Sequence, residues 1–295
     1  WWLRDQQALW LFGEDSLDGR MRVAVRNGIS LQELELCDLA VTPTEWQRQQ
    51  FPQRQQGQLQ VVFDGVDTRM FRPEPWSGTV HLHGDAIEQP LRLEPQHRVL
   101  SYGTRGMEPL RGFPEFMRLL PALMQRFPDL QVVVAGNDRV AYSYRAPSCG
   151  GSWKQHLLNE LDGQLDRSRL HFTGSLNYIN YIRMLQRSDL HVVFSRPYVT
   201  SWGLFQAAAC GARLLLNREP GIQSVVPEHQ AIWVDLDQTQ QLQDTASEAL
   251  ADAIQQRSQP RMSLLKPEWE IRACLQRWQA LINQALKQTQ AASGS

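Results

Sequence analysis

The chain has 295 residues, and 30 lysines and arginines against 31 aspartates and glutamates leave a formal net charge of −1 at pH 7. This balance argues against a protein that coats nucleic acid or anionic lipid. With 42% hydrophobic and 21% charged residues, the composition is that of a globular protein long enough for two domains, and no stretch approaches the roughly 18 uncharged apolar residues of a membrane span.

Residues 1–75 are expected to hold the last elements of an α/β domain, too few to bury a core alone. A helix is expected over 21–36, strands over 38–42 and 60–63, and a second helix after Thr44. The chain opens at Trp1 inside an apolar stretch, which favours a missing N-terminal part. A face rich in Trp1, Trp2 and Trp10 is a candidate contact for a peripheral membrane surface or a protein partner.

Residues 76–96 are expected to connect the two parts, with alternating runs on either side of Gly84 and Asp85 that indicate a hairpin. His81 and His83 share one face of this segment, but no third ligand is apparent and no metal site is predicted. The four cysteines form no CxxC pair, which argues against a zinc site or a disulfide framework and favours a reduced, cytoplasmic setting. They are Cys37, Cys149, Cys210 and Cys274.

Residues 97–260 alternate short β-branched runs with longer amphipathic stretches, which predicts β-α-β units around a parallel sheet buried on both faces. The expected strands are 98–102, 131–136, 169–173, 190–194, 213–216 and 231–234, and the expected helices are 113–127, 153–161, 179–187, 203–210 and 239–256. Right-handed crossovers wind them into one doubly wound, Rossmann-like domain. A closing helix is expected within 261–288, before a tail at 289–295.

Ligands of a doubly wound sheet bind outside the carboxyl ends of its strands, so a ligand site is expected in the loops that follow the strands. The loop expected after residue 102 holds Arg105 and Arg111 among glycines. Two guanidinium groups beside flexible backbone suit a bidentate grip on a phosphate or diphosphate. The alternative is that one of these arginines pairs with Glu108 on the surface.

The loop expected after residue 194 provides a second candidate phosphate contact. Ser201 or Thr200 can cap a helix that begins near Gly203, and a phosphate would be stabilised by the free N–H groups and the dipole of that helix. The chain has no G-x-x-x-x-G-K-[ST], G-x-G-x-x-G or G-x-S-x-G motif, which lowers the case for triphosphate hydrolysis, nicotinamide chemistry and serine hydrolysis.

Six blocks in this order carry a resemblance: CDLAVTPTEWQRQQFP (37–52), VVFDGVDTRMFRP (61–73), RGMEPLRGFPEFM (105–117), VVVAGNDRVAY (132–142), LHFTGSLNYINYIRML (170–185) and RPYVTSWGLFQAAACG (196–211). The set resembles the family 4, or group 1, retaining glycosyltransferases of the GT-B fold, over about residues 20–240. In that family two Rossmann domains face each other across a cleft. This chain looks like the entire donor-binding domain, with a parallel sheet, plus a partial N-terminal α/β domain of the acceptor side.

The resemblance implies a set of site residues. Arg105 stands where the family grips the donor diphosphate, and Arg111 where it usually has a lysine with the same task. The segments implied beside the sugar, the base and the phosphates of the donor are, in that order, Gly136 and Asn137; Thr173, Gly174, Ser175 and Leu176; and Ser201, Trp202, Gly203 and Leu204.

The chain departs from the family at two glutamates, eight positions apart, that lie near the donor sugar and on the ribose. Tyr198 and Gln206 stand there, and Gln223 stands where a further glutamate is common. An uncharged glutamine would weaken a bond to the ribose by about 1–2 kcal/mol, roughly a tenfold loss in donor affinity. Tyr198 and Gln206 are nevertheless expected to contact the donor.

The resemblance implies transfer of a sugar from a nucleoside-diphosphate donor, such as a UDP- or GDP-sugar, to an unknown carbohydrate, lipid or small-molecule acceptor, with retention and without a metal or other cofactor. The mechanism needs positioning and stabilisation of the departing charge rather than an enzyme nucleophile. One alternative is a degenerate, non-catalytic GT-B module that acts as a binding or assembly partner. A second alternative is an epimerase of nucleotide sugars.

Overall fold

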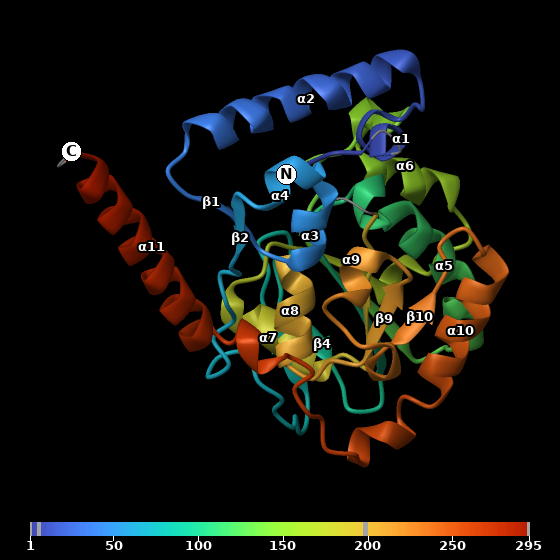
Figure 1. Ribbon diagram of the computed structural model, residues 1–295. Coiled ribbons are helices and arrows are strands. Elements are labelled where there is room, and N and C mark those ends of the chain that lie inside the picture. Colours follow the sequence, from blue (N-terminus) through green and yellow to red (C-terminus); the bar gives the residue numbers. More distant parts are fainter. Residues whose placement is uncertain (1, 5–6, 197–199, 294–295) are drawn as a thin grey trace. The chain divides into compact units, whose positions relative to one another are not determined.

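The computed structural model describes residues 2–4, 7–196 and 200–293, with the backbone alone for 288–293. The chain divides into two compact units, one of Trp1–Met70 with Leu265–Ser295 and the other of Phe71–Leu264. Figure 1 shows their elements. The segment 76–96, expected as a connector, belongs to the larger unit, and the closing helix belongs to the smaller one.

The smaller unit consists of helices around a two-stranded parallel sheet of β1 and β2. Ser16 and Thr44 cap the N-termini of α2 and α3 through their hydroxyl groups, so the second helix starts where the sequence predicts. The N–H of Val66 donates to the carbonyl oxygen of Trp269, and the N–H of Ile271 donates to the carbonyl oxygen of Val66. These two bonds join the segment after β2 to the start of the last helix. The elements are α1 Ala8–Phe12, α2 Leu17–Leu36, β1 Ala40–Thr42, α3 Glu45–Gln50, α4 Gln53–Gln56, β2 Leu59–Val61 and α11 Ile271–Ser293.

The larger unit is built on a six-stranded sheet in which all pairings are parallel, in the order β10-β9-β8-β5-β6-β7. The strands are β5 Arg98–Gly106, β6 Leu130–Asn137, β7 Leu170–Gly174, β8 Leu190–Val193, β9 Leu214–Asn217 and β10 Ile232–Val234. Chain order runs outward from β5 in one direction and from β8 in the other, as in Rossmann sheets. All six predicted strands are confirmed, and the switch point lies between β5 and β8.

Helices cover this sheet as the sequence predicts, with α10 ending earlier than expected. The hairpin is also present, as antiparallel strands β3 and β4. The remaining elements are β3 Val80–Leu82, β4 Leu91–Leu93, η2 Pro109–Arg111, α5 Phe113–Arg126, η3 Cys149–Gly151, α6 Trp153–Glu160, η4 Arg167–Arg169, α7 Tyr178–Arg187, α8 Trp202–Ala209, α9 Pro220–Gln223, η5 Glu228–Gln230, α10 Thr239–Ala251, η6 Gln255–Ser258 and, in the smaller unit, η7 Pro267–Trp269.

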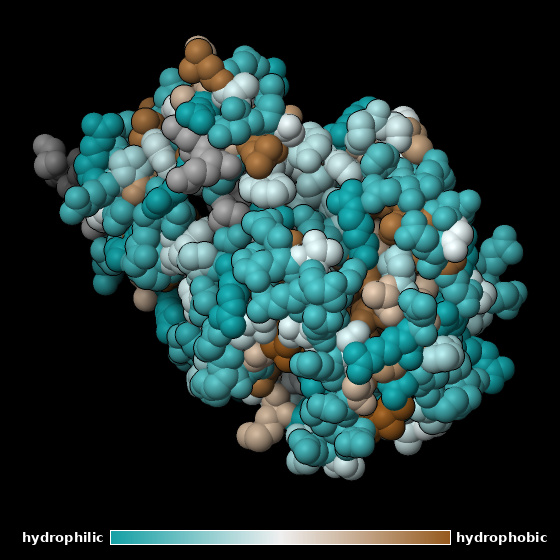
Figure 2. Space-filling model, turned by 90° about the vertical axis from the view of Figure 1, so that its right-hand side faces the viewer, coloured by the Kyte–Doolittle hydropathy of each residue, from teal (hydrophilic) through white to brown (hydrophobic). Residues whose placement is uncertain are grey.

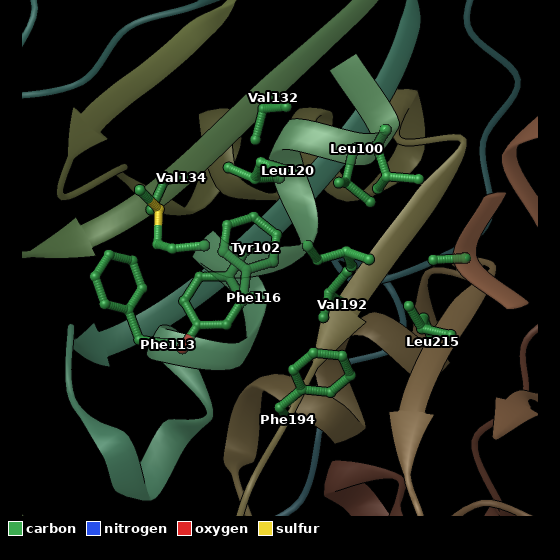
Figure 3. Packing of buried hydrophobic residues seen from close by; sticks show 14 of the residues in the cluster. Leu100, Tyr102, Phe113, Phe116, Leu120, Val132, Val134, Val192, Phe194 and Leu215 are labelled. Atoms are coloured by element: carbon green, nitrogen blue, oxygen red, sulfur yellow. The ribbon is translucent and has the colours of Figure 1, made fainter. Parts of the chain in front are cut away.

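A continuous core lies between the sheet and helices α5, α6 and α10 (Figure 3). The ring of Tyr102 stacks on Phe116 with centroids 4.5 Å apart and contacts Phe113 at 5.9 Å. Its hydroxyl group donates to the carbonyl oxygen of Arg111 at 2.8 Å, which satisfies a buried polar group and fixes the turn of η2. The core therefore determines where the backbone of Arg111 leaves the sheet.

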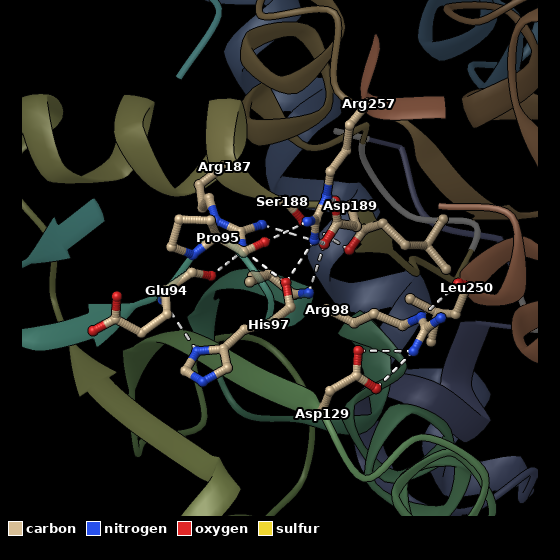
Figure 4. Close-up of polar contacts among 12 residues, drawn as sticks. Glu94, Pro95, His97, Arg98, Asp129, Arg187, Ser188, Asp189, Leu250 and Arg257 are labelled. Carbon is tan, nitrogen blue, oxygen red and sulfur yellow. Dashed lines mark hydrogen bonds and ion pairs between the residues drawn. The ribbon is translucent and has the colours of Figure 1, made fainter. Parts of the chain in front are cut away.

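A buried ionic cluster joins the amino ends of the central strands β5 and β8 (Figure 4). The switch-point loops follow the opposite, carboxyl ends of these strands. Asp189 accepts from Arg257 at 2.7 and 2.6 Å, from Arg187 at 3.2 Å and from the N–H of Val99 at 2.8 Å. Burial lowers the pKa of Arg187 to about 10, and its guanidinium carbon lies 4.0 Å from the centroid of the Trp76 ring. One carboxylate thus holds two guanidinium groups and a strand N–H in place.

The face shown in Figure 2 is mostly hydrophilic, with hydrophobic residues scattered among polar ones. Among the described residues, no helix combines the length and the apolar character needed to cross a membrane.

Candidate functional site

The loops that follow β5 and β8 meet at the switch point of the sheet. Arg111 Nη1 donates to Ser195 Oγ at 3.3 Å, and the N–H of Arg196 donates to the carbonyl oxygen of Leu110 at 2.9 Å. Asn217, the last residue of β9, accepts from the N–H of Ser195 at 2.9 Å and donates to its carbonyl oxygen at 2.8 Å. Three strand ends are therefore tied together where a doubly wound sheet binds its ligand.

Gly112 makes this approach possible. Its φ is +62°, and a Cβ atom there would lie 2.4 Å from the Cβ of Phe194, at the end of β8. An L side chain is disfavoured on both grounds. The glycine that the sequence presents as flexible backbone beside Arg111 is a close-packing position.

Arg105 lies inside β5 rather than in the loop where the sequence analysis places it, because β5 continues to Gly106 with a shift in its register against β6. Its side chain is exposed, and Nη1 donates to the hydroxyl oxygen of Tyr142 at 2.9 Å. The guanidinium carbons of Arg105 and Arg111 lie 5.8 and 5.7 Å from the centroid of the same Tyr142 ring. The structure thus brings the two predicted arginines together at one aromatic side chain.

Glu108 pairs with backbone rather than with an arginine. Its side chain is fully buried, and Oε2 accepts from the N–H groups of Ala141, Tyr142 and Ser143 at 2.8, 2.8 and 2.9 Å. Within the described part of the chain, Oε1 has no hydrogen-bond partner. The expected alternative of a surface ion pair is wrong, because this carboxylate anchors the segment that follows β6.

Gly136 and Asn137 end β6 next to β5. Gly136 has φ +132°, and a Cβ atom there would lie 1.9 Å from the carbonyl oxygen of Thr104. The exposed Asn137 accepts through Oδ1 from Ser175 Oγ at 3.1 Å. Two of the segments that the resemblance assigns to the donor are thus joined by a side-chain hydrogen bond.

Thr173 and Gly174 are the last residues of β7, and Ser175 and Leu176 follow it; this segment already contacts the hairpin loop of the same unit. Asp85 Oδ1 accepts from the N–H of Ser175 at 2.7 Å, and the N–H of Asp85 donates to the carbonyl oxygen of Ser175 at 3.3 Å. The carbonyl oxygen of Thr173 accepts from the N–H of Ala86 at 3.1 Å. These backbone groups of Thr173 and Ser175 are already hydrogen-bonded to the hairpin loop. A base bound here would therefore contact other groups of the segment.

Helix α8 begins at Trp202, with Ser201 in the N-cap position, but the Ser201 side chain makes no capping hydrogen bond. Thr200 Oγ1 donates instead to the carbonyl oxygen of Gly221 at 3.1 Å. The predicted side-chain cap is wrong, because neither hydroxyl group bonds to an N–H group at the start of α8.

The remaining residues of this segment are placed as follows. Gly203 and Gln206 are half-buried in α8, and Leu204 is fully buried, so Leu204 contributes packing and its backbone. Tyr198 lies outside the described residues.

Glu219, which the sequence analysis does not single out, follows β9 beside Asn217. Its pKa is raised to about 7, mainly by burial. The nearby charge of Arg196 lowers this pKa, and those of Asp237 and Asp235 raise it. Arg196 is itself buried, with Nη2 2.6 Å from Glu115 Oε1 and Nη1 3.5 Å from Asp237 Oδ1. A carboxyl group that titrates near neutrality thus lies on the β9 side of the switch point.

Tyr142, Glu108 and Ser195 also belong to the site, although they were not expected from the sequence as site components. Tyr142 closes one of the six quoted blocks, which is the signal that was available for it. Among the described residues, no group of three or more His, Cys, Asp and Glu side chains is arranged to hold a metal ion.

The strand order and the loops that meet at the switch point define a doubly wound, Rossmann-like unit, as expected for one half of a GT-B glycosyltransferase. A family model described as "Glycosyl transferase-like" matches residues 115–274, more than half of the chain. A second model, "Glycosyl transferase family 4 group", matches residues 12–71. This protein therefore belongs to the family 4, group 1 glycosyltransferases. No curated protein matches it.

Solved structures share the fold. A sucrose-phosphate synthase from Thermosynechococcus elongatus matches with a TM-score of 0.57 at 17% identity, over 94% of this chain and 61% of that chain. HepE from Anabaena, in complex with UDP, matches with a TM-score of 0.56 at 15% identity, over 93% of this chain and 70% of that one. The C-terminal domain of a group 1 glycosyl transferase (LpcC) from Francisella tularensis matches with a TM-score of 0.50 at 18% identity, over 70% of this chain and all of that domain.

Proposed function

We propose that the unit Phe71–Leu264 binds the nucleoside-diphosphate-sugar donor of a glycosyltransferase, and that the complete enzyme transfers the sugar to a carbohydrate, lipid or small-molecule acceptor with retention of configuration. The observation that carries the proposal is the convergence of Arg105 and Arg111 on Tyr142 at the switch point. The UDP complex of HepE, a structure of the same fold, supports a uridine nucleotide as the first donor to test.

In the proposed reaction the chain must stabilise a departing diphosphate. As the bond between the anomeric carbon and the diphosphate oxygen breaks, negative charge grows on the leaving group, and two guanidinium groups nearby stabilise it. The oxygen of the acceptor hydroxyl then bonds to the anomeric carbon on the same face of the sugar, and its proton passes to the departing diphosphate. The proposal needs no metal ion to stabilise the charge of the departing diphosphate. It also includes a cytoplasmic location, which the four free cysteines support.

Calorimetric titration of the chain with UDP, GDP and ADP, and with their sugar conjugates, tests the donor assignment. We expect one nucleotide to bind in the micromolar range, with its monophosphate binding more weakly because it lacks the group that the arginines hold. If none of the three nucleotides binds to the folded chain, donor binding is ruled out as its function.

A non-catalytic GT-B module is the second candidate, because the half-buried Gln206 supplies an amide where the family supplies a carboxylate. A module of this kind would bind a partner without transferring sugar. Transfer or hydrolysis of a nucleotide sugar by the chain would exclude it. Either reaction is measured as the nucleoside diphosphate released, with and without added acceptors.

A further inference from the structure

Tyr142 contacts both arginines of the candidate site. Its hydroxyl oxygen accepts from Arg105 Nη1 at 2.9 Å, and the two guanidinium carbons lie within 6 Å of its ring centroid. We propose that Tyr142 is a positioning residue that holds Arg105 and Arg111 in the arrangement that receives the donor diphosphate. This inference rests on the proposed donor site and assigns a cause to its geometry.

Two guanidinium groups at one ring repel each other, and an exposed arginine side chain samples many rotamers. The face of an aromatic ring attracts cations, and the phenol oxygen adds an acceptor for Arg105. Tyr142 therefore offsets part of the repulsion and limits the rotamers of Arg105 before any ligand arrives. Less ordering is then needed when the diphosphate binds.

Tyr142 is held in place by the buried carboxylate of Glu108. The N–H groups of Tyr142 and of its two neighbours, Ala141 and Ser143, all donate to Glu108 Oε2. Close packing adds to this, since a Cβ atom on Gly106 would lie 2.7 Å from the carbonyl oxygen of Arg139 and 3.3 Å from Ala141 Cβ. The segment around Tyr142 is thus fixed to the end of β5, the strand that carries Arg105.

Two substitutions separate the contributions of the hydroxyl and the ring. Tyr142→Phe removes the acceptor of Arg105 and keeps the ring, and we expect the Kd for UDP to rise about 3- to 10-fold. Tyr142→Ala also removes the ring, and we expect a rise of about 10- to 50-fold. Tyr144→Phe is the matched control, because Tyr144 lies two residues away and packs its ring on Trp153 instead.

The readout that separates positioning from general damage is the ratio of the Kd values for UMP and UDP. If Tyr142 acts through the arginines, the loss in affinity falls on UDP and the ratio shrinks, while the affinity for UMP changes little. In the Arg105→Ala background, Tyr142→Phe should cost less than in the wild type, because the hydroxyl then has no Arg105 to hold. Calorimetry on the wild type, the two single variants and the double variant measures this coupling.

The inference is overturned if Tyr142→Phe and Tyr142→Ala bind UDP as the wild type does, or more tightly, while Arg105→Ala loses binding; the proposed function would then stand. Equal losses for UMP and UDP, or full additivity with Arg105→Ala, would also overturn it. If the wild-type chain binds none of UDP, GDP and ADP, the proposed function fails and takes the inference with it.

Discussion

Arg111 and Ser195 leave the sheet from adjacent strands on opposite sides of the switch point, and a 3.3 Å hydrogen bond joins Arg111 Nη1 to Ser195 Oγ. Ser195 is in turn fixed by both polar ends of the Asn217 side chain. The guanidinium group is thus anchored to the strand ends that surround it. A cation presented in this way needs little reorganisation to receive an anion.

Replacing Gln206 with glutamate tests the main departure from the family. Gln206→Glu places a carboxylate on α8, and a charge-assisted hydrogen bond to the ribose should tighten UDP binding by about tenfold. The gain should vanish with 2′,3′-dideoxy-UDP, which lacks the hydroxyl groups. Equal affinity of Gln206→Glu and wild type for UDP would place the ribose elsewhere.

Removing the Asp189 carboxylate should strongly destabilise the larger unit. Asp189→Ala leaves Arg187 and Arg257 without their shared carboxylate and Val99 without an acceptor, so we expect a loss of about 3–5 kcal/mol in the free energy of unfolding. Asp129→Ala is the control, because Asp129 pairs with Arg98 where both side chains are partly exposed (Figure 4). Denaturant unfolding that shows the two variants to be equally stable would contradict the assigned role.

A methyl group at Gly136 should disturb the junction between β5 and β6. Gly136→Ala puts a Cβ atom 1.9 Å from the Thr104 carbonyl oxygen at a φ of +132°. We expect a loss of more than about 2 kcal/mol in unfolding free energy. Gly28→Ala, in an open position of α2, should instead be neutral or stabilising. A Gly136→Ala variant with wild-type thermal stability would show that this close approach is unimportant.

Glu219 should make stability depend on pH. Its pKa is about 7 in the folded chain against a usual 4.5, so between these values the folded state keeps a proton that the unfolded state has lost. Stability therefore falls as the pH rises through this window, and Glu219→Gln should remove that part of the loss. Thermal unfolding should show Glu219→Gln gaining on the wild type from pH 4.5 to pH 8. A constant difference across this range would contradict the raised pKa.

The strands of the larger unit could be predicted because central parallel strands are buried on both faces and therefore appear as short apolar runs. The end of β5 could not, because Gly103 and Gly106 resemble loop residues, and only pairing with β6 shows that the strand continues. The cap of α8 was misjudged because a Thr200 hydroxyl can bond to a distant carbonyl as readily as to its own helix.

The site could be predicted only in part, for a related reason. Arginines in a loop after a strand suggest an anion, and Arg105 and Arg111 do converge. The partners of Glu108 are backbone N–H groups more than thirty residues further along the chain, and no spacing pattern indicates such a contact. Tyr142 could not be linked to the arginines for the same reason.

Calorimetric titration of UDP into the wild type, Arg105→Ala, Arg111→Ala and the double variant tests the central claim most directly. We expect micromolar binding by the wild type, a loss of about tenfold or more for each single variant, and no detectable binding by the double variant. Arg126→Ala, at the far end of α5 from Arg111, should bind as the wild type does. Unchanged UDP binding by the folded double variant would show that the diphosphate is held elsewhere.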